Sequence, residues 1–139
     1  MINSKDLRIG NFVNSITLGI KEAVITGLAP SGKCFLKDTS TVDYIDQLEP
    51  IYITQEWLLN FGAEDFEDFY KLNAGKNRCL IVELYSDFIR LNYYAKWGNQ
   101  GKAASLGSFE PLYIHQLQNI FFALTGEELS VKETDVENS

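Results

Sequence analysis

The chain of 139 residues is long enough for one domain or for two small lobes that share an interface. A hydrophobic fraction of 45% and an aromatic fraction of 13% supply a sizeable core, which excludes an intrinsically disordered protein. The net charge is −7, and five acids and one lysine between Glu127 and Ser139 carry −4 of it. Without an excess of Lys and Arg, we do not expect nucleic acid as a partner.

Polar and charged residues interrupt the N-terminal segment, so no signal peptide is predicted. No apolar stretch approaches the roughly 20 residues that a membrane-spanning helix needs. We therefore expect a soluble, cytoplasmic protein without a membrane partner. The two cysteines, Cys34 and Cys79, are too few for a disulfide framework and are not clustered like metal ligands. We expect both to be small buried side chains, and we expect no metal ion and no cofactor.

The first lobe, residues 1–53, is predicted to be a small curled sheet or barrel. Four short runs rich in β-formers are separated by turn residues, which is typical of such folds. The expected strands are Leu7–Val13, Leu18–Ile25, Lys33–Lys37 and Val42–Leu48. Between the second and third, Ala29-Pro30-Ser31-Gly32 predicts a turn, because Pro fixes one dihedral and Gly permits a positive one. The opening run resembles the first strand of many SH3-like barrels.

A short helix is predicted after this lobe, at Gln55–Phe61. Thr54 is a suitable N-cap residue and Gly62 a suitable stop. We place the boundary between the lobes in the segment just before Thr54. The second lobe is then residues 54–131, and the acidic tail 132–139 is expected to be disordered.

A three-stranded antiparallel meander is predicted in the second lobe. Its strands end near Leu72 and run over Cys79–Tyr85 and Phe88–Tyr94. If Ser86-Asp87 is a two-residue turn, the register follows, because the turn fixes which residues face each other. The expected pairs are Leu84 with Ile89, Glu83 with Arg90, Val82 with Leu91 and Leu80 with Tyr93.

The outer face of this hairpin carries Tyr85, Phe88, Arg90 and Tyr94. We expect the N-terminal lobe to cover it, because a domain with many aromatic residues usually buries them. The alternative is an open aromatic patch suited to a partner.

The pattern breaks from Ala95 to Gly107, and we expect a long loop there. Its Gly98-Asn99-Gln100-Gly101-Lys102-Ala103 run is not a P-loop. Only two residues separate the glycines, and Ala follows the Lys where Ser or Thr is needed. The loop could bind an anion through Lys96 and Lys102, with Trp97 as a stacking platform. Together with Tyr94 and Arg90, these are the candidate ligand-binding or partner-binding residues.

The last predicted element is a long helix from Pro111 to Gly126. Leu117, Ile120 and Leu124 recur at helical spacing, so this apolar stripe should pack on the meander. His115 and Gln118 are expected on a polar face in water. An edge strand is possible after the helix, at Leu129–Val131.

No catalytic residues are predicted. His115 is the only histidine, so no pair of histidines can bind a metal, and no nucleophile is placed near it by a local pattern. The acids from Glu64 to Asp68 lack the ligand spacing and central Gly of a calcium loop. We therefore expect a protein that is not an enzyme.

Four segments of the chain resemble a known family when they are taken together. They are Leu7–Val13, Leu48-Glu49-Pro50-Ile51, Glu56–Gly62 and the stretch from Tyr113 through Leu129. They resemble small uncharacterised proteins encoded by Bacteroides-group gut bacteria and by their phages and mobile elements. The resemblance implies a genomic setting and no catalytic residues.

The sequence as a whole predicts an α+β protein. An SH3-like β-barrel lobe is followed by a helix, a three-stranded antiparallel meander and a long C-terminal helix. The expected function is that of a non-enzymatic binding protein, a phage or mobile-element accessory factor that acts on a host protein. The alternative is a small-ligand or nucleotide binder that uses the 95–107 loop. The identity of the protein partner and the oligomeric state do not follow from the sequence.

Overall fold

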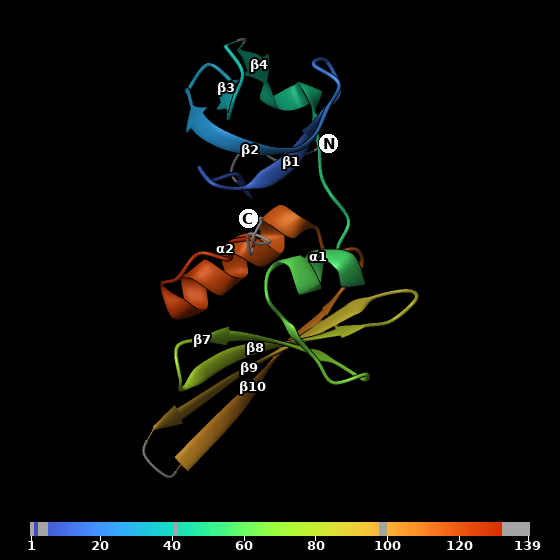
Figure 1. The fold of residues 1–139 in the computed structure, drawn as a ribbon, viewed down its shortest axis with the longest axis vertical. Helices are drawn as coiled ribbons and strands as arrows, with labels where there is room; N and C mark the ends of the chain where they lie inside the picture. The colour runs from blue at the N-terminus through green and yellow to red at the C-terminus, as the bar shows by residue number, and fades with distance from the viewer. Residues whose placement is uncertain (1, 3–5, 41, 98–99, 132–139) are drawn as a thin grey trace, which may run out of the picture. The chain divides into compact units, whose positions relative to one another are not determined.

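The computed structural model describes residues 2, 6–40, 42–97 and 100–131, without the side chain of Trp97. The fold is α+β, with mostly strands and two α-helices, as predicted (Figure 1). The chain forms two compact units. The first unit combines Met1–Tyr52 with Tyr113–Ile120, and the second combines Ile53–Leu112 with Phe121–Ser139. The sequence-based division assigned all of residues 54–131 to one lobe, and its acidic tail, 132–139, lies outside the described residues.

The first unit contains a curled, half-barrel sheet of five antiparallel strands in the order β4-β3-β2-β1-β5. A single turn of 3-10 helix, η2, separates the last two strands along the chain. The elements are β1 Phe12–Ser15, β2 Ile20–Leu28, β3 Lys33–Leu36, β4 Asp43–Tyr44, η2 Ile45–Gln47 and β5 Leu48–Glu49. The turn at Ala29–Gly32 is confirmed: Gly32 N donates to Ala29 O at 3.1 Å, and Gly32 has a φ of +89°.

Three predicted strands of this unit were wrong in their bounds. The first begins at Phe12, not at Leu7, because the chain turns at Gly10. The φ of Gly10 is +98°, a backbone conformation that few residues other than glycine adopt. The fourth is not continuous over Val42–Leu48, since η2 interrupts it. The second strand was predicted at Leu18–Ile25 but spans Ile20–Leu28.

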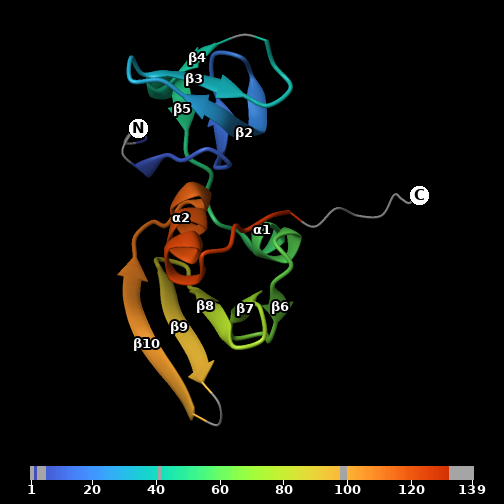
Figure 2. The same cartoon turned by 90° about the vertical axis from the view of Figure 1, so that its left-hand side faces the viewer.

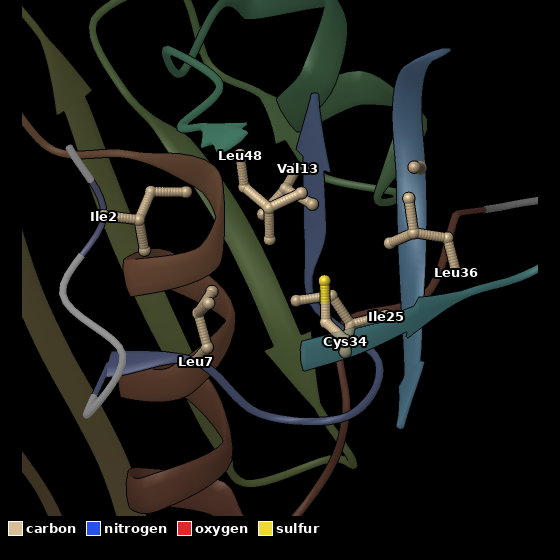
Figure 3. Close-up of a cluster of buried hydrophobic side chains, with 8 residues drawn as sticks. Ile2, Leu7, Val13, Ile25, Cys34, Leu36 and Leu48 are labelled. Carbon is tan, nitrogen blue, oxygen red and sulfur yellow. The ribbon is translucent and has the colours of Figure 1, made fainter. Parts of the chain in front are cut away.

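The core of the first unit consists of apolar side chains from its strands and its N-terminal segment (Figure 3). Val13, Ile25 and Cys34 are fully buried. Burial, with the nearby Asp43 carboxylate, raises the pKa of the Cys34 thiol to about 11. Cys34 is therefore the inert, buried residue that the sequence predicted.

The second unit begins with α1, Gln55–Asn60, and continues into a five-stranded antiparallel sheet in the order β10-β9-β8-β7-β6 (Figure 2). The strands are β6 Glu64–Asp65, β7 Tyr70–Ala74, β8 Arg78–Leu84, β9 Ile89–Trp97 and β10 Gln100–Phe109. The predicted cap of α1 is confirmed, because the Thr54 side chain accepts a hydrogen bond from Trp57 N at 3.2 Å.

The predicted β8–β9 register is confirmed at every pair. Leu84 lies opposite Ile89, Glu83 opposite Arg90, Val82 opposite Leu91 and Leu80 opposite Tyr93. Tyr85 N donates to Phe88 O at 3.0 Å, which closes the two-residue turn. The turn and the alternation of apolar residues specify the same register, so the sequence alone was sufficient here.

The predicted loop at residues 95–107 was wrong. The segment forms the end of β9 and most of β10, paired from Gln100 with Trp97 to Phe109 with Ile89. The small residues of β10 hid the strand, because they give no apolar alternation and have low β-propensity. A register shift between Ser105 and Gly107, where φ is +101°, marks a bulge in β10.

Helix α2 spans Ile114–Thr125, three residues shorter at its start than predicted. Ile114 N donates to Ile51 O at 2.8 Å, so an orphan donor of the first turn is satisfied. The helix ends at Gly126, with φ of +75°, as predicted. Leu117 is fully buried, whereas the other predicted stripe residues, Ile120 and Leu124, are partly buried. No strand forms at Leu129–Val131.

The polar face of α2 was expected in water, and this expectation was wrong. His115 is only 2% exposed and Gln118 only 1%. Gln118 Oε1 accepts from Phe12 N at 2.9 Å, and its Nε2 donates to Gly10 O at 3.0 Å. Asn119 Oδ1 accepts from Arg8 Nε at 2.8 Å. The amide side chains of Gln118 and Asn119 are thus hydrogen-bonded within the first unit, because a buried amide must find partners.

Replacing Leu117 with Ala should lower the free energy of unfolding by about 2–5 kcal/mol, because the fully buried side chain would leave a cavity. The matched control is Leu59→Ala in α1, where the leucine is 43% exposed. Its cost should stay within about 0.5 kcal/mol. Urea unfolding of both variants measures the difference, and equal costs would contradict the assignment of Leu117 to the core.

Replacing Gln118 with Leu should also destabilise the protein, by about 1–3 kcal/mol for each group left unpaired. The variant removes the acceptor of Phe12 N and the donor to Gly10 O. Gln55→Leu on the exposed surface of α1 is the control and should have little effect. A Gln118→Leu protein as stable as the wild type would show that this network does not stabilise the fold.

Candidate functional site

The two faces of the second sheet differ in their side chains. Leu72, Leu80, Val82 and Leu91 alternate along β7, β8 and β9, and all are at most 1% exposed. This is the inner face. The side chains between them define the outer face. The pairing Lys71–Ile81–Asn92 forms one of its rows, and Asn73–Cys79–Tyr94–Ala103 forms the next.

Both helical segments of the second unit lie on the inner side of this sheet (Figures 1 and 2). Tyr93 Oη donates to Leu124 O at 3.5 Å, which ties the end of α2 to the inner face of β9. Within the second unit, therefore, no described helix covers the outer face. The segment between β6 and β7 borders it instead, with Phe66 and Phe69 stacked at 4.9 Å between ring centroids.

One hollow on the outer face, of about 290 Å³, has a mainly apolar lining. We call it the aromatic hollow. Its apolar lining is Phe66, Phe69, Ile81, Tyr93, Tyr94 and Ala103, and Lys71, Cys79 and Asn92 also border it. Phe66 is 47% exposed and Tyr94 39%, so aromatic surface is open to solvent here. Flat, rigid rings of this kind favour the binding of other flat or apolar groups.

Tyr94 lies across the neighbouring strand β10. A Cβ atom added to Gly101 would come within 2.0 Å of Tyr94 Oη and 2.7 Å of its Cζ. Gly101 therefore leaves room for the Tyr94 ring, and the cross-strand partner Ala103 is also small. The small residues of β10 thus let the ring lie over the sheet.

A second hollow, of about 280 Å³, adjoins the first and shares Lys71, Cys79 and Tyr94 with it. We call it the cationic hollow. Its lining is Lys71, Asn73, Lys76, Asn77, Arg78, Cys79, Tyr94 and Lys96. Four of the twelve Lys and Arg residues of the chain line this one hollow, and its lining contains no carboxylate. An acidic protein thus carries a local positive surface.

Among the described residues the cations of this hollow form no ion pair, although the Glu64 carboxylate lies nearby and accepts a hydrogen bond from Asn73 Nδ2 at 2.6 Å. Among the described residues, none of Lys71, Lys76, Arg78 and Lys96 forms an ion pair, whereas Arg90 pairs with Glu83 at 3.9 Å. Burial raises the pKa of the Cys79 thiol; the charge of Lys71 opposes this shift and the Glu64 carboxylate adds to it. Cys79 is therefore neutral at pH 7 and does not cancel the positive charge.

The other end of the outer face is a separate cluster at the β8–β9 turn. The Tyr85 and Phe88 rings stack at 4.6 Å, and the Arg90 guanidinium lies 5.6 Å from the Tyr85 ring centroid. Tyr85 Oη donates to Glu83 Oε1 at 2.6 Å. Tyr85 is 45% exposed and Tyr94 39%, so the second unit itself does not bury these rings, and the cover expected from the N-terminal lobe stays a prediction.

The structure brings together only some of the candidate residues from the sequence. Lys96 and Tyr94 line the cationic hollow. Lys102 pairs with the inner-face residue Ala95, so it lies on the opposite face of the hairpin from Lys96. Arg90 belongs to the cluster at the β8–β9 turn. The side chain of Trp97 lies outside the part that the structure describes.

Sequence reasoning missed several residues of both hollows, among them Phe66, Phe69, Lys71, Lys76 and Arg78. The signal for Lys71 was available, because a strand was predicted to end near the apolar Leu72, and side chains that are neighbours in a strand point to opposite faces. No local pattern places Lys76 or Phe66, since both lie in turns that bring them to the sheet only after folding.

His115 is buried beside Tyr113, with ring centroids 6.0 Å apart. Its Nδ1 has no hydrogen-bond partner among the described residues. Burial lowers the pKa of His115, and the Asp6 carboxylate opposes this shift. A neutral imidazole in a packed environment has a structural role here, and a dissolved substrate has no direct access to it.

The described residues contain no group of three or more His, Cys, Asp or Glu that could hold a metal ion. Glu64 and Asp65 form β6, and the following acids are exposed. In the part of the chain that the structure describes, neither helix is both long and apolar enough to cross a membrane.

The burial of His115 predicts a loss of stability in acid. Its pKa is lower in the folded state than the value of about 6.5 expected when unfolded. The unfolded state therefore binds more protons, and stability present above about pH 6.5 is lost as the pH falls toward the folded pKa. Melting temperatures of the wild type and of His115→Gln, measured on both sides of this pH, test the effect. The wild type should lose more stability in acid, and identical pH dependence would contradict the prediction.

The hollows, the exposed rings and the cations of the outer face are the site that this chain offers. Comparison of the chain with protein-family models, with curated proteins and with solved structures finds no match.

Proposed function

We propose that this protein is a non-enzymatic binding protein and that the outer face of the β6–β10 sheet is its recognition surface. The observation that carries the proposal is the exposure of several aromatic side chains on this face of the sheet and at its border. Phe66, Tyr85 and Tyr94 are each at least 39% exposed, and a hollow of about 290 Å³ lies beside two of them. Exposed aromatic side chains at a concave surface are typical of interaction sites.

The burial of the histidine and of both cysteines supports a binding role. His115, the only histidine of the chain, is 2% exposed and its pKa is lowered by burial. Both cysteines are buried, and burial raises the pKa of each thiol, so neither is an activated nucleophile.

The resemblance to proteins of Bacteroides-group bacteria, their phages and mobile elements suggests an accessory factor that acts on a host protein. We propose further that the first unit is an SH3-like barrel. Support comes from the strand order β4-β3-β2-β1-β5, from the pairing of the last strand with the first, and from the 3-10 turn between β4 and β5.

A second candidate function is the binding of a small anionic ligand or nucleotide. The cationic hollow favours it, because four cations that form no ion pair among the described residues surround one concavity. The ligand would bind on the outer face of the sheet. It would not use a flexible loop, since residues 100–107 form part of β10.

A capture experiment from host lysate tests the leading proposal. Tyr94→Ala should reduce capture of the partner about tenfold or more, because an aromatic residue at the centre of an interface commonly contributes over 1 kcal/mol. Tyr44→Ala in β4 of the first unit is the matched control, with a tyrosine that is 49% exposed. Capture that is unchanged by Tyr94→Ala but lost with Tyr44→Ala would move the recognition surface to the first unit.

A further inference from the structure

We propose that the two adjoining hollows of the outer face bind one nucleotide, with its phosphate in the cationic hollow and its base in the aromatic hollow. The inference rests on the second candidate function and names its ligand. The two hollows share Lys71, Cys79 and Tyr94, so a single small molecule can occupy both. Such a ligand needs an anionic group directly connected to a flat ring system.

The cationic hollow fits a phosphate better than a carboxylate. Four cations line it, and none of them forms an ion pair among the described residues. A phosphate monoester carries about −1.5 to −2 charges at pH 7 and three strong acceptor oxygens, whereas a carboxylate carries a single charge. Lys71 and Lys96 can donate to these oxygens as flexible point charges. The neutral Cys79 thiol adds no repulsion.

The aromatic hollow fits a planar ring. Phe66 and Phe69 are stacked with an interplanar angle of 17°, and the Tyr94 ring lies over Gly101. Bases stack on exposed aromatic rings of this kind, largely independently of base identity. The Asn92 side chain also borders the hollow, and an amide can both donate to and accept from the edge of a base.

An acidic peptide and a long nucleic acid fit these features less well. A peptide carboxylate would leave most of the cations unneutralised, and an extended peptide loses chain entropy on binding. A long strand would place further phosphates near a protein whose net charge is −7. Because a third of the Lys and Arg residues line one hollow, the attraction is local and suits a single nucleotide, either free or at the end of a strand.

Calorimetric titration of the full chain with adenosine monophosphate tests the proposal, with adenosine and inorganic phosphate as partial ligands. The monophosphate should bind more tightly than either part, because each part fills one hollow. Lys96→Ala should weaken it about tenfold, since a hydrogen bond to a charged group is lost. Lys102→Ala is the matched control on the opposite face of the same hairpin and should leave the affinity unchanged.

Two further variants test the base position. Tyr94→Ala should weaken the binding of both adenosine and its monophosphate, whereas Tyr85→Ala, at the other end of the outer face, should weaken neither. Gly101→Ala should act like Tyr94→Ala, because the added Cβ meets the tyrosine ring. Thermal melts check that each variant folds. If Lys96→Ala does not fold, Lys76→Ala takes its place.

A short single-stranded oligonucleotide with a terminal phosphate distinguishes the source of the ligand. If the oligonucleotide competes with the monophosphate, both bind at the proposed site, and the end of a nucleic-acid strand can be its ligand. Three results would overturn the proposal: no binding of the monophosphate, equal effects of the two lysine variants, or binding only of a peptide that carries acidic and aromatic residues. These results would leave the proposed protein partner intact, because that proposal depends on capture and not on nucleotide affinity.

Discussion

The alternation of side chains across β7, β8 and β9 is the constraint on which the rest of the second unit depends. Strand side chains point to opposite faces in turn, so burying Leu72, Leu80 and Leu91 forces their neighbours outward. The two-residue turn at Ser86-Asp87 fixes the register, and a shift by one residue would exchange the faces. The same register that forms the core therefore assembles Lys71, Ile81 and Tyr94 into one surface.

The proposed recognition surface contains residues that add little to stability. Gly101 weakens a strand intrinsically, but its missing side chain makes space for the Tyr94 ring. The lysines and arginine of the cationic hollow repel one another when no anion is present, which opposes folding slightly. A surface that combines strand-weakening residues with unpaired like charges is better explained by binding than by stability.

The sequence predicted those parts of the fold where two local signals agree. The Ser86-Asp87 turn and the apolar alternation gave the β8–β9 register, and Thr54 gave the cap of α1. Strand β10 was missed because Gly, Ala and Ser carry no periodic signal. Burial of Gln118 was missed because its partners, Gly10 and Phe12, are more than 100 residues away in the chain. Of the predicted site, Tyr94 and Lys96 meet at the hollows, but the other lining cations are brought there by tertiary structure.

Nuclear magnetic resonance of the ¹⁵N-labelled full chain, titrated with adenosine monophosphate, locates any binding directly. The account predicts that the shifted amide signals come from residues around Lys71, Cys79 and Tyr94. These three residues lie in adjacent strands and border both hollows. Signals at the β8–β9 turn and in the strands of the first unit should stay in place. Shifts confined to the first unit or to the β8–β9 turn, or no shifts at all, would contradict the assignment of the outer face as a nucleotide site.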